Sequence, residues 1–321
     1  MKIEISAVVC THNRASYLAR ALCSLAAQSL NPQRFEVLVV DNASHDETRC
    51  IFDFYRALPN WLYLYEAVPG LSIARNMGWQ NAHGKYIAFM DDDAVASPRW
   101  LENYLAAFEN APIQTGCIGG RCLPAWEKPR PAWLADSMLT AFSIFNYGSD
   151  PLVLGPHQHL TGCNFAFPLT VLERVDGFCE DLGRKGQNLL SNEDIYMREQ
   201  LDRLGLQSVY DPEIVVEHTI PAERLTKRWF RQRAWWQGIS QGRMSQMNGT
   251  PSTGRRLLSI LQKSGWGLLR LGRALVSSSP AKRFRRELQV YEAAGEISAL
   301  WQMRSNRSEL LAKVDTSQEL L

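Results

Sequence analysis

The sequence predicts an α/β protein, in which a mostly parallel sheet is flanked by helices and followed by a helical C-terminal extension. Three observations indicate this class. Short apolar runs alternate with helical patterns over the first hundred residues, polar clusters follow the first, second and fourth of these runs, and the chain after about residue 245 is basic and amphipathic. Alternation of strands and helices favours parallel pairing with helices on both faces of the sheet.

The strands are predicted from short apolar runs that end at polar turns. We expect them at residues 6–10, 35–40, 61–65, 86–90, 161–167, 208–210 and 214–217. The run 86–90 leads directly into Asp91-Asp92-Asp93. Residues 126–133 hold two prolines among charged residues and tryptophans, a composition typical of a loop.

The helices are predicted from apolar periodicity and from the residues at their ends. We expect them between residues 15 and 30, after residues 44–47, and at 71–81, 99–108, 168–177 and 192–205. The first carries Leu18, Leu22 and Leu25 on one face. Ser44–Glu47 matches a capping box. Ser97-Pro98 and Asn192 supply the residue types that begin helices.

The expected domains are a catalytic domain at residues 1–245 and a helical extension at 246–321, with a boundary near Asn248-Gly249-Thr250-Pro251. Within the extension, Arg255–Val276 places leucines among arginines, as an interfacial helix does. Docking on the catalytic domain, or on a second subunit of a homo-oligomer, fits this pattern equally well, so these alternatives stay open.

Composition limits the class and the compartment. Of the 321 residues, 45% are hydrophobic and 21% charged, which is ordinary for a folded protein, and a net charge of +2 argues against a dedicated nucleic-acid binder. The seven cysteines form no CxxC pair, so we expect reduced thiols. Because no apolar run approaches the ~20 residues of a membrane span, the expected location is cytoplasmic, with peripheral contact at the inner face of the membrane left open.

The acidic triplet Asp91-Asp92-Asp93 is the strongest chemical signal. Adjacent carboxylates repel one another unless a cation neutralises them. Carboxylate oxygens completed by phosphate oxygens and water suit Mn²⁺ or Mg²⁺. The alternative is a solvated acidic loop at a helix start. The carboxyl ends of parallel strands form the ligand crevice of such sheets, which favours the metal site.

The motifs on this rim resemble those of glycosyltransferase family 2, whose catalytic domain has the GT-A fold. They occur in the family's order, over roughly residues 3 to 240: Val8–Arg14, Val39–Ser44, Gly70–Gly78, Asp91–Asp93 and Asn192–Asp194. By this resemblance, the donor is a nucleotide diphosphate sugar. The residues implied to bind it are Thr11, Asn13, Arg14, Asp41, Arg75, Asp91 and Asp92.

The resemblance also implies individual roles. Thr11, Asn13 and Asp41 line the base and ribose pocket, Arg75 contacts base or phosphate, and Asp92 faces the ribose. Asp93 holds the metal with Asp91 in support, and His218, expected at a strand end, is a further metal or phosphate contact. The alternatives are that Asn13 is a turn residue, that Arg75 forms a structural ion pair, and that His218 is structural.

The family's acidic pair matches Glu193-Asp194, and the role of general base carries over to Asp194. A carboxylate that takes the acceptor hydroxyl's proton permits backside attack with inversion, so no enzyme nucleophile is required. The alternative is that both acids only favour the dipole of a helix start.

The resemblance implies that four residues lie on the acceptor side: Gly162, Asn164, Trp235 and Trp236. The first two resemble the family segment before the acceptor cleft; an ordinary core strand is the alternative. Residues 232–236 are close to the Gln-x-x-Arg-Trp signature of processive synthases but carry Trp235 where arginine is expected. We therefore expect transfer of a single sugar.

The function implied is metal-dependent, inverting transfer from a nucleotide diphosphate sugar, UDP favoured, to a hydroxyl of a glycan or lipid-linked saccharide in cell-surface polysaccharide synthesis. A sugar nucleotidyltransferase would need a glycine-rich basic loop where residues 11–14 stand, and a dehydrogenase would need GxGxxG. A catalytically degenerate transferase acting as an assembly partner would have lost a carboxylate, and none of the expected ones is missing.

Overall fold

The structure is a computed structural model that describes residues 2–156, 158–186, 188–247 and 280–318, the side chains after residue 301 excepted. Two compact units are present. The sheet unit comprises Met1–Arg130, Leu139–Gln187 and Glu193–Ala222; the helical unit comprises Pro131–Met138, Asn188–Asn192 and Glu223–Leu321. Residues 227–247 thus group with the helical unit, while the domain boundary expected at residue 245 stays a prediction.

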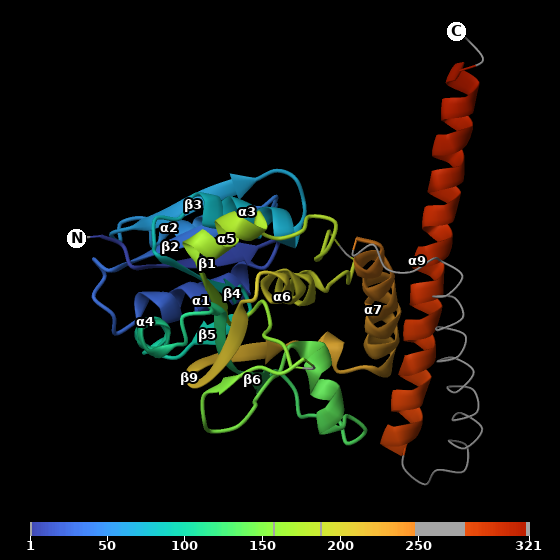
Figure 1. The fold of residues 1–321 in the computed structure, drawn as a ribbon. Coiled ribbons are helices and arrows are strands. Elements are labelled where there is room, and N and C mark those ends of the chain that lie inside the picture. The colour runs from blue at the N-terminus through green and yellow to red at the C-terminus, as the bar shows by residue number, and fades with distance from the viewer. Residues whose placement is uncertain (1, 157, 187, 248–279, 319–321) are drawn as a thin grey trace. The chain divides into compact units, whose positions relative to one another are not determined.

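The sheet unit contains one mixed sheet in the order β3-β2-β1-β4-β8-β6-β9-β5, with β7 beside β9 (Figure 1). Its first four strands are parallel, as expected, whereas β8 is antiparallel to both β4 and β6. The strands are β1 (Ile5–Thr11), β2 (Phe35–Asn42), β3 (Trp61–Glu66), β4 (Tyr86–Asp91), β5 (Ala94–Ala96), β6 (Thr115–Trp126), β7 (Leu152–Val153), β8 (Phe165–Pro168) and β9 (Gln207–Ile220).

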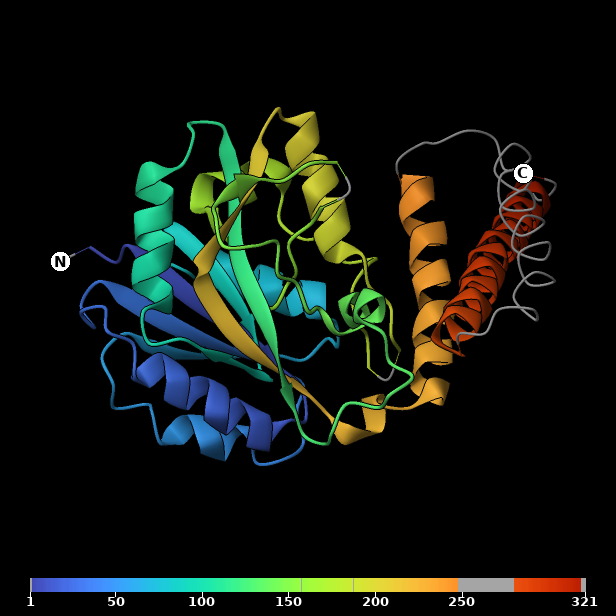
Figure 2. The ribbon, with the colours of Figure 1, turned by 90° about the horizontal axis from the view of Figure 1, so that it is seen from below.

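Helices cover both faces of this sheet (Figure 2), which confirms the predicted class. On one face lie α1 (Ala15–Ala26), α2 (Thr48–Asp53) and α4 (Trp100–Asn110); on the other lie α3 (Leu71–Gln80), α5 (Leu169–Val175) and α6 (Glu193–Arg203). The predicted stripe of Leu18, Leu22 and Leu25 on α1 is fully buried. Short 3-10 turns occupy Asp136–Phe142 and Ala222–Arg224.

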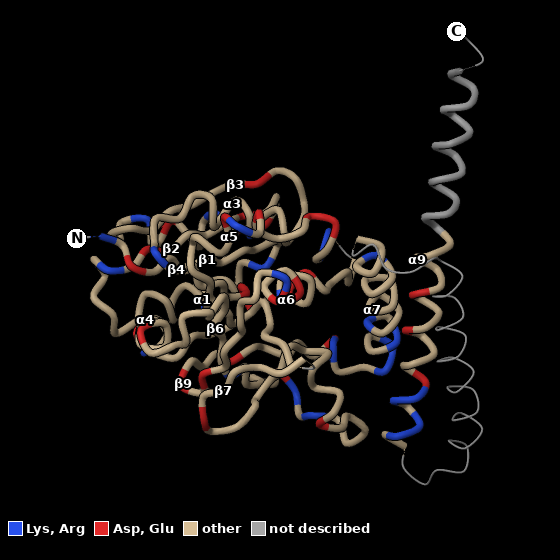
Figure 3. Tube along the Cα trace, viewed as in Figure 1, with Lys and Arg blue, Asp and Glu red and all other residues tan. Residues whose placement is uncertain are grey.

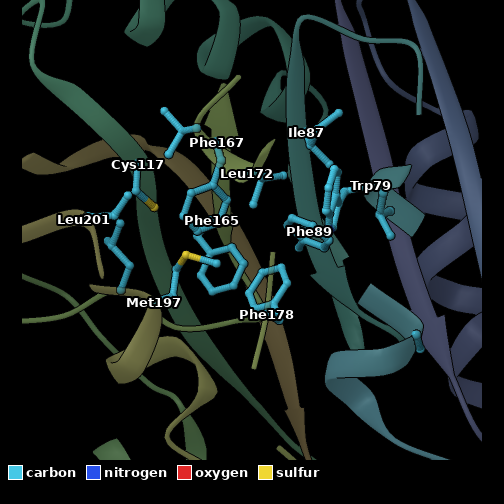
Figure 4. Close-up of a cluster of buried hydrophobic side chains, with 14 of the residues drawn as sticks. Trp79, Ile87, Phe89, Cys117, Phe165, Phe167, Leu172, Phe178, Met197 and Leu201 are labelled. Atoms are coloured by element: carbon cyan, nitrogen blue, oxygen red, sulfur yellow. The ribbon is translucent and has the colours of Figure 1, made fainter. Parts of the chain in front are cut away.

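The core beneath α3, α5 and α6 is rich in aromatic rings (Figure 4). Phe89 of β4 makes edge-on contacts with Phe165, Phe167 and Phe178, at centroid distances of 5.6, 6.2 and 5.1 Å. Strands covered on both faces need continuous apolar runs, which is why β1, β2 and β4 are recognisable in the sequence. This core fixes the strand ends that carry the polar clusters.

Two local expectations were wrong. The two strands expected at 208–210 and 214–217 form a single strand, β9, whose pairing with β6 continues past an irregularity after Gly120. The start of α2 is stabilised by Asp46, whose Oδ1 accepts from the backbone N and Oγ1 of Thr48, and not by a capping box from Ser44. Asn192 directly precedes α6, as expected, and its side chain hydrogen-bonds to Gln237 and Gln241 within the helical unit.

The helical unit is built on two parallel helices, α7 (Lys227–Met247) and α9 (Pro280–Gln318). Their backbones approach closely at glycines: a Cβ on Gly238 would lie 1.8 Å from the Glu292 carbonyl oxygen, and one on Gly295 2.0 Å from that of Trp235. The expected interfacial segment Arg255–Val276 lies outside the described residues. Within the described ranges, no helix is both long and apolar enough to cross a bilayer.

Candidate active site

The parallel strands bring three polar clusters to one edge of the sheet. In the register of the sheet, Thr11 at the end of β1 pairs with Asp41 of β2, and Cys10 pairs with Asp91 of β4. Thr11, Asp41, Asp92 and Asp93 are all buried. The clusters predicted from separate stretches of sequence therefore form one polar site at the carboxyl ends of the strands.

Arg14 and Thr11 hold the second and third carboxylates of the triplet. Arg14 donates from Nη1 to Asp92 Oδ1 (2.8 Å) and from Nη2 to Asp93 Oδ2 (2.7 Å), and Thr11 Oγ1 donates to Asp92 Oδ2 (2.8 Å). Burial raises the pKa of Asp92 to about 6, with Asp93 adding to the rise and Arg14 opposing it. A cationic group thus compensates these buried carboxylates in the metal-free chain.

His218 completes a group of metal-ligating atoms. It lies in β9 two residues before the strand ends, not at the end itself, and its Nε2 is 2.9 Å from Asp93 Oδ1. Its Nδ1 donates to the Phe142 carbonyl oxygen at 2.8 Å, which orients the ring and leaves Nε2 facing the carboxylates. Burial is the largest influence and lowers the pKa of His218, but the Asp93 charge and hydrogen bond raise it to about 9.

Asp91, Asp93 and His218 fit a divalent cation. One ligand atom of each lies within 4.8 Å of the others. Two carboxylate oxygens and an imidazole nitrogen leave coordination positions for phosphate oxygens and water, the set that Mn²⁺ accepts and that Mg²⁺ accepts with more difficulty because it prefers oxygen. The hydrogen bond from His218 to a carbonyl is the usual support of a metal-ligating histidine.

Arg75 connects the triplet to α6. Its buried guanidinium donates to Glu193 Oε1 at 2.9 Å and to Asp91 Oδ1 at 3.3 Å, with Phe165 and Phe178 rings about it. Gly162 makes room for it, since an added Cβ there would lie 2.2 Å from Arg75 Nη2. These contacts show that Arg75 forms ion pairs, which was the alternative expectation. Its contact with base or phosphate stays a prediction.

The start of α6 therefore lies at the edge of the sheet where the triplet stands. Glu193 is buried and bound to Arg75, whereas the next residue, Asp194, is partly exposed, with Oδ1 accepting from the backbone N of Ile195 at 2.8 Å. Glu193 is thus a buried acid paired with a cation, whereas Asp194 is accessible to solvent. A carboxylate that takes a proton from an acceptor has to be within hydrogen-bond reach of it, which favours the partly exposed Asp194 over Glu193.

Asn13 joins the loop that follows β1 to the loop that follows β2. With φ of 53°, it donates its backbone N–H to Ser44 Oγ (2.9 Å), and its Oδ1 accepts from the backbone N of His45 (2.7 Å). Asp41 accepts from the backbone N of Ser44 and from the Tyr63 hydroxyl. Asn13 acts as a turn residue here, and its side chain also fixes the loop that follows Asp41.

Sequence reasoning missed Tyr63 and Asn42. Tyr63 lies in β3, and only the tertiary contact reveals its bond to Asp41. Asn42 bridges from β2 to the loop before α3: it donates to the Val68 carbonyl (2.7 Å) and accepts from the Gly70 N–H (2.7 Å). The signal available in the sequence was an asparagine directly after an aspartate at a strand end.

The residues expected on the acceptor side belong to different units, Gly162 and Asn164 to the sheet unit and Trp235 and Trp236 to the helical unit. Asn164 is fully buried: its Oδ1 accepts from Trp100 Nε1 and Tyr104 Oη, and its Nδ2 donates to the carbonyls of Arg121 and Ile214. An amide has no further hydrogen-bonding capacity, so the expected acceptor contact of Asn164 is contradicted. Trp235 and Trp236 pack in the helical unit against a small core of Leu190, Ile239 and Ala299.

The mixed sheet with helices on both faces has the GT-A fold of glycosyltransferases. The profile of glycosyl transferase family 2 matches residues 6–175, more than half of the chain. The chain belongs to glycosyltransferase family 2, and it is a glycosyltransferase that uses a nucleotide-sugar donor.

Relatives and solved structures agree with this assignment. The glucosyl-dolichyl phosphate glucuronosyltransferase of Haloferax volcanii is 27% identical over 246 residues, 74% of this chain and 76% of that protein. The succinoglycan biosynthesis protein ExoM of Rhizobium meliloti is 26% identical over 93% of each chain. The fold resembles the mannosyltransferase PcManGT of Pyrobaculum calidifontis in complex with GDP-Man and Mn²⁺, with TM-score 0.62, 19% identity, and coverage of 94% of this chain and 88% of that one.

Proposed function

We propose that the protein transfers a single sugar, with inversion, from a nucleotide diphosphate sugar to a hydroxyl of a glycan or lipid-linked saccharide in cell-surface polysaccharide synthesis. UDP is the favoured nucleotide. The observation that carries the proposal is the link Asp91–Arg75–Glu193, which ties the cation-binding edge of the sheet to the helix start that presents Asp194. We propose a cytoplasmic location, with contact at the inner face of the membrane.

Asp93, Asp91 and His218 would hold the divalent cation, and Asp92 would face the ribose with Thr11 fixing its orientation. When bound, the cation stabilises the negative charge that builds on the leaving diphosphate. Asp41, held by Tyr63 and the Ser44 N–H, retains acceptor capacity for an imide N–H of the base or a ribose hydroxyl. Arg14 would contact the diphosphate when the cation binds, because it is partly exposed and lies beside both carboxylates.

Asp194 would act as the general base. Its carboxylate takes the proton of the acceptor hydroxyl while the hydroxyl oxygen bonds to the anomeric carbon. The bond from that carbon to the diphosphate oxygen breaks on the opposite face, the diphosphate leaves with the electron pair, and the configuration inverts. Arg75 holds Glu193, and through it the first turn of α6, so that Asp194 stays in place.

The names of the relatives support this acceptor class. One relative acts on a glucosyl-dolichyl phosphate and another takes part in succinoglycan biosynthesis. Solved structures of similar fold bind GDP-Man with Mn²⁺ and, for TarS of S. aureus (TM-score 0.53, 18% identity, 95% of this chain and 92% of that fragment), UDP. A sugar nucleotidyltransferase would instead require a triphosphate, and a catalytically degenerate partner protein would turn over nothing.

A panel of UDP, GDP and dTDP sugars tests the donor proposal, with thermal shift and release of nucleotide diphosphate as readouts in Mn²⁺ or Mg²⁺. We expect only UDP-sugars to raise the melting temperature, and only when metal is present. We also expect slow release of UDP from these donors. Stabilisation by a triphosphate with release of pyrophosphate would contradict the proposal. No turnover with any donor and acceptor would favour the degenerate protein.

A further inference from the structure

Within the part of the helical unit whose side chains are described, the exposed lysines and arginines gather at the N-terminal ends of α7 and α9. We infer that residues 223–233 and 280–287, here called the basic end, dock on an anionic lipid bilayer. The inference deepens the proposed function, because a lipid-linked acceptor lies in a membrane. The binding itself is measured without any sugar transfer, so the two proposals can fail separately.

Aromatic rings hold the two helix ends side by side. Trp133 makes edge-on contacts with Phe230 of α7 and Phe284 of α9, at centroid distances of 5.4 and 5.3 Å. Arg231 of α7 also pairs with Glu287 of α9 at 2.6 Å. Since the helices run parallel, both N-termini, and all the charges near them, lie at the same end of the pair (Figure 3).

The basic end has a much higher net positive charge than the chain as a whole. Its two segments hold nine lysines and arginines and only two acids, one of which is Glu287, whereas the whole chain carries a net charge of +2. The exposed cations of the basic end are Lys227, Arg228, Lys282, Arg283 and Arg285. The N-terminal dipoles of two parallel helices add positive potential at the same place. Such a cluster attracts the negative surface of an anionic bilayer over about a Debye length, ~8–10 Å at physiological salt.

The aromatic residues favour a bilayer over a nucleic acid. Trp133 and Trp229 are only partly buried and sit among the cations, as tryptophans do at the level of lipid headgroups. Phe230 meets both tryptophan rings edge-on, and Phe284 meets Trp133 in the same way, so part of each tryptophan is covered by another ring. Proteins that bind single strands instead offer open ring faces on which bases stack. The geometry therefore favours contact between the N-terminal ends of the two helices and the lipid headgroups.

Cosedimentation of the full chain with vesicles tests the inference. We expect the protein to pellet with vesicles of phosphatidylcholine mixed with phosphatidylglycerol, to stay in solution with phosphatidylcholine alone, and to release at high salt. The test variant changes Lys227→Gln, Arg228→Gln, Arg283→Gln and Arg285→Gln together. At roughly five-fold per cation near the surface, its affinity for the anionic vesicles should fall about 10²- to 10³-fold.

The matched control removes four exposed cations from the sheet unit: Lys2→Gln, Arg56→Gln, Lys85→Gln and Arg174→Gln. It has the same net charge as the test variant and should bind vesicles nearly as the unmodified chain does. Circular dichroism and thermal unfolding check that both variants fold. Equal loss in both variants, unchanged binding by the test variant, equal binding to neutral vesicles, or preferential binding of single-stranded RNA would each overturn the inference.

Discussion

Arg75 of α3 and Glu193 of α6, 118 residues apart in the chain, form a buried ion pair at 2.9 Å, and the same guanidinium reaches Asp91. Removing one partner of a buried pair leaves an uncompensated charge, whose cost is typically 3–5 kcal/mol. The pair joins the cation-binding edge to the helix that presents Asp194. The position of Asp194 therefore depends on a residue that was expected to contact the nucleotide.

Gly162→Ala should disturb this link without removing any charge. The added Cβ would lie 2.2 Å from Arg75 Nη2, so the guanidinium has to move from Asp91 or Glu193. We expect destabilisation of about 1–3 kcal/mol, as for other overpacking changes, and a loss of transfer. Thermal unfolding and kcat measure both effects. Gly155→Ala is the control, because its Cβ would meet only Gln158 Oε1 at 3.6 Å; a Gly162→Ala variant as stable and active as this control would contradict the account.

Arg14→Ala should affect metal and donor binding in opposite directions. Arg14 is the cation that pairs with both Asp92 and Asp93, so its removal should tighten binding of Mn²⁺ alone, by about 10-fold if one charge-assisted bond of ~1.5 kcal/mol no longer competes with the metal. The affinity for the nucleotide diphosphate sugar should fall, because the diphosphate loses a cation. Calorimetric titration with each ligand reports the two changes. Weaker binding of Mn²⁺ alone would show that Arg14 only arranges the carboxylates.

Metal affinity should rise with pH between about 6.5 and 9. The metal-free pKa of His218 is raised to about 9, so at neutral pH the ring is protonated and must lose its Nε2 proton to become a ligand. Below this pKa the affinity for Mn²⁺ should increase up to ~10-fold per pH unit and then level off above it. Calorimetry in buffers of different ionisation enthalpy should show release of one proton at pH 7. His218→Gln should bind more weakly and lack this dependence; an identical slope would remove His218 from the metal site.

Asn164→Ala should act on stability and not on acceptor recognition. The variant leaves the Trp100 and Tyr104 donors and two carbonyls without their partner, each at about 1–3 kcal/mol if buried and unpaired. We expect a large fall in Tm with little change in the KM for the acceptor at a temperature where the variant is folded. Asn110→Ala is the control, since its exposed amide bonds only to the Ala106 carbonyl. A selective rise in the acceptor KM would restore the original expectation for Asn164.

The sheet edge could be predicted from the sequence because its strands are continuous apolar runs that end at polar residues. Asp91–Asp93 follows such a run, and the order of the motifs along the chain indicated the family. The roles of Arg75, Gly162 and Asn164 could not be predicted, because each depends on partners that only the folded chain supplies. A glycine gives no sign that a guanidinium will fill the space beside it. The irregular pairing of β9 also escaped, since the polar stretch after Tyr210 resembles a turn.

In the proposed reaction, Asp194 removes the proton of the acceptor hydroxyl while Asp91, Asp93 and His218 hold the cation with the diphosphate. The most direct measurement is single-turnover transfer by Asp194→Asn, beside calorimetric binding of Mn²⁺ and donor to the same variant. The account predicts that the rate of the chemical step falls about 10²- to 10⁴-fold while the affinities for metal and donor stay as in the unmodified chain. Transfer at the unmodified rate would contradict it.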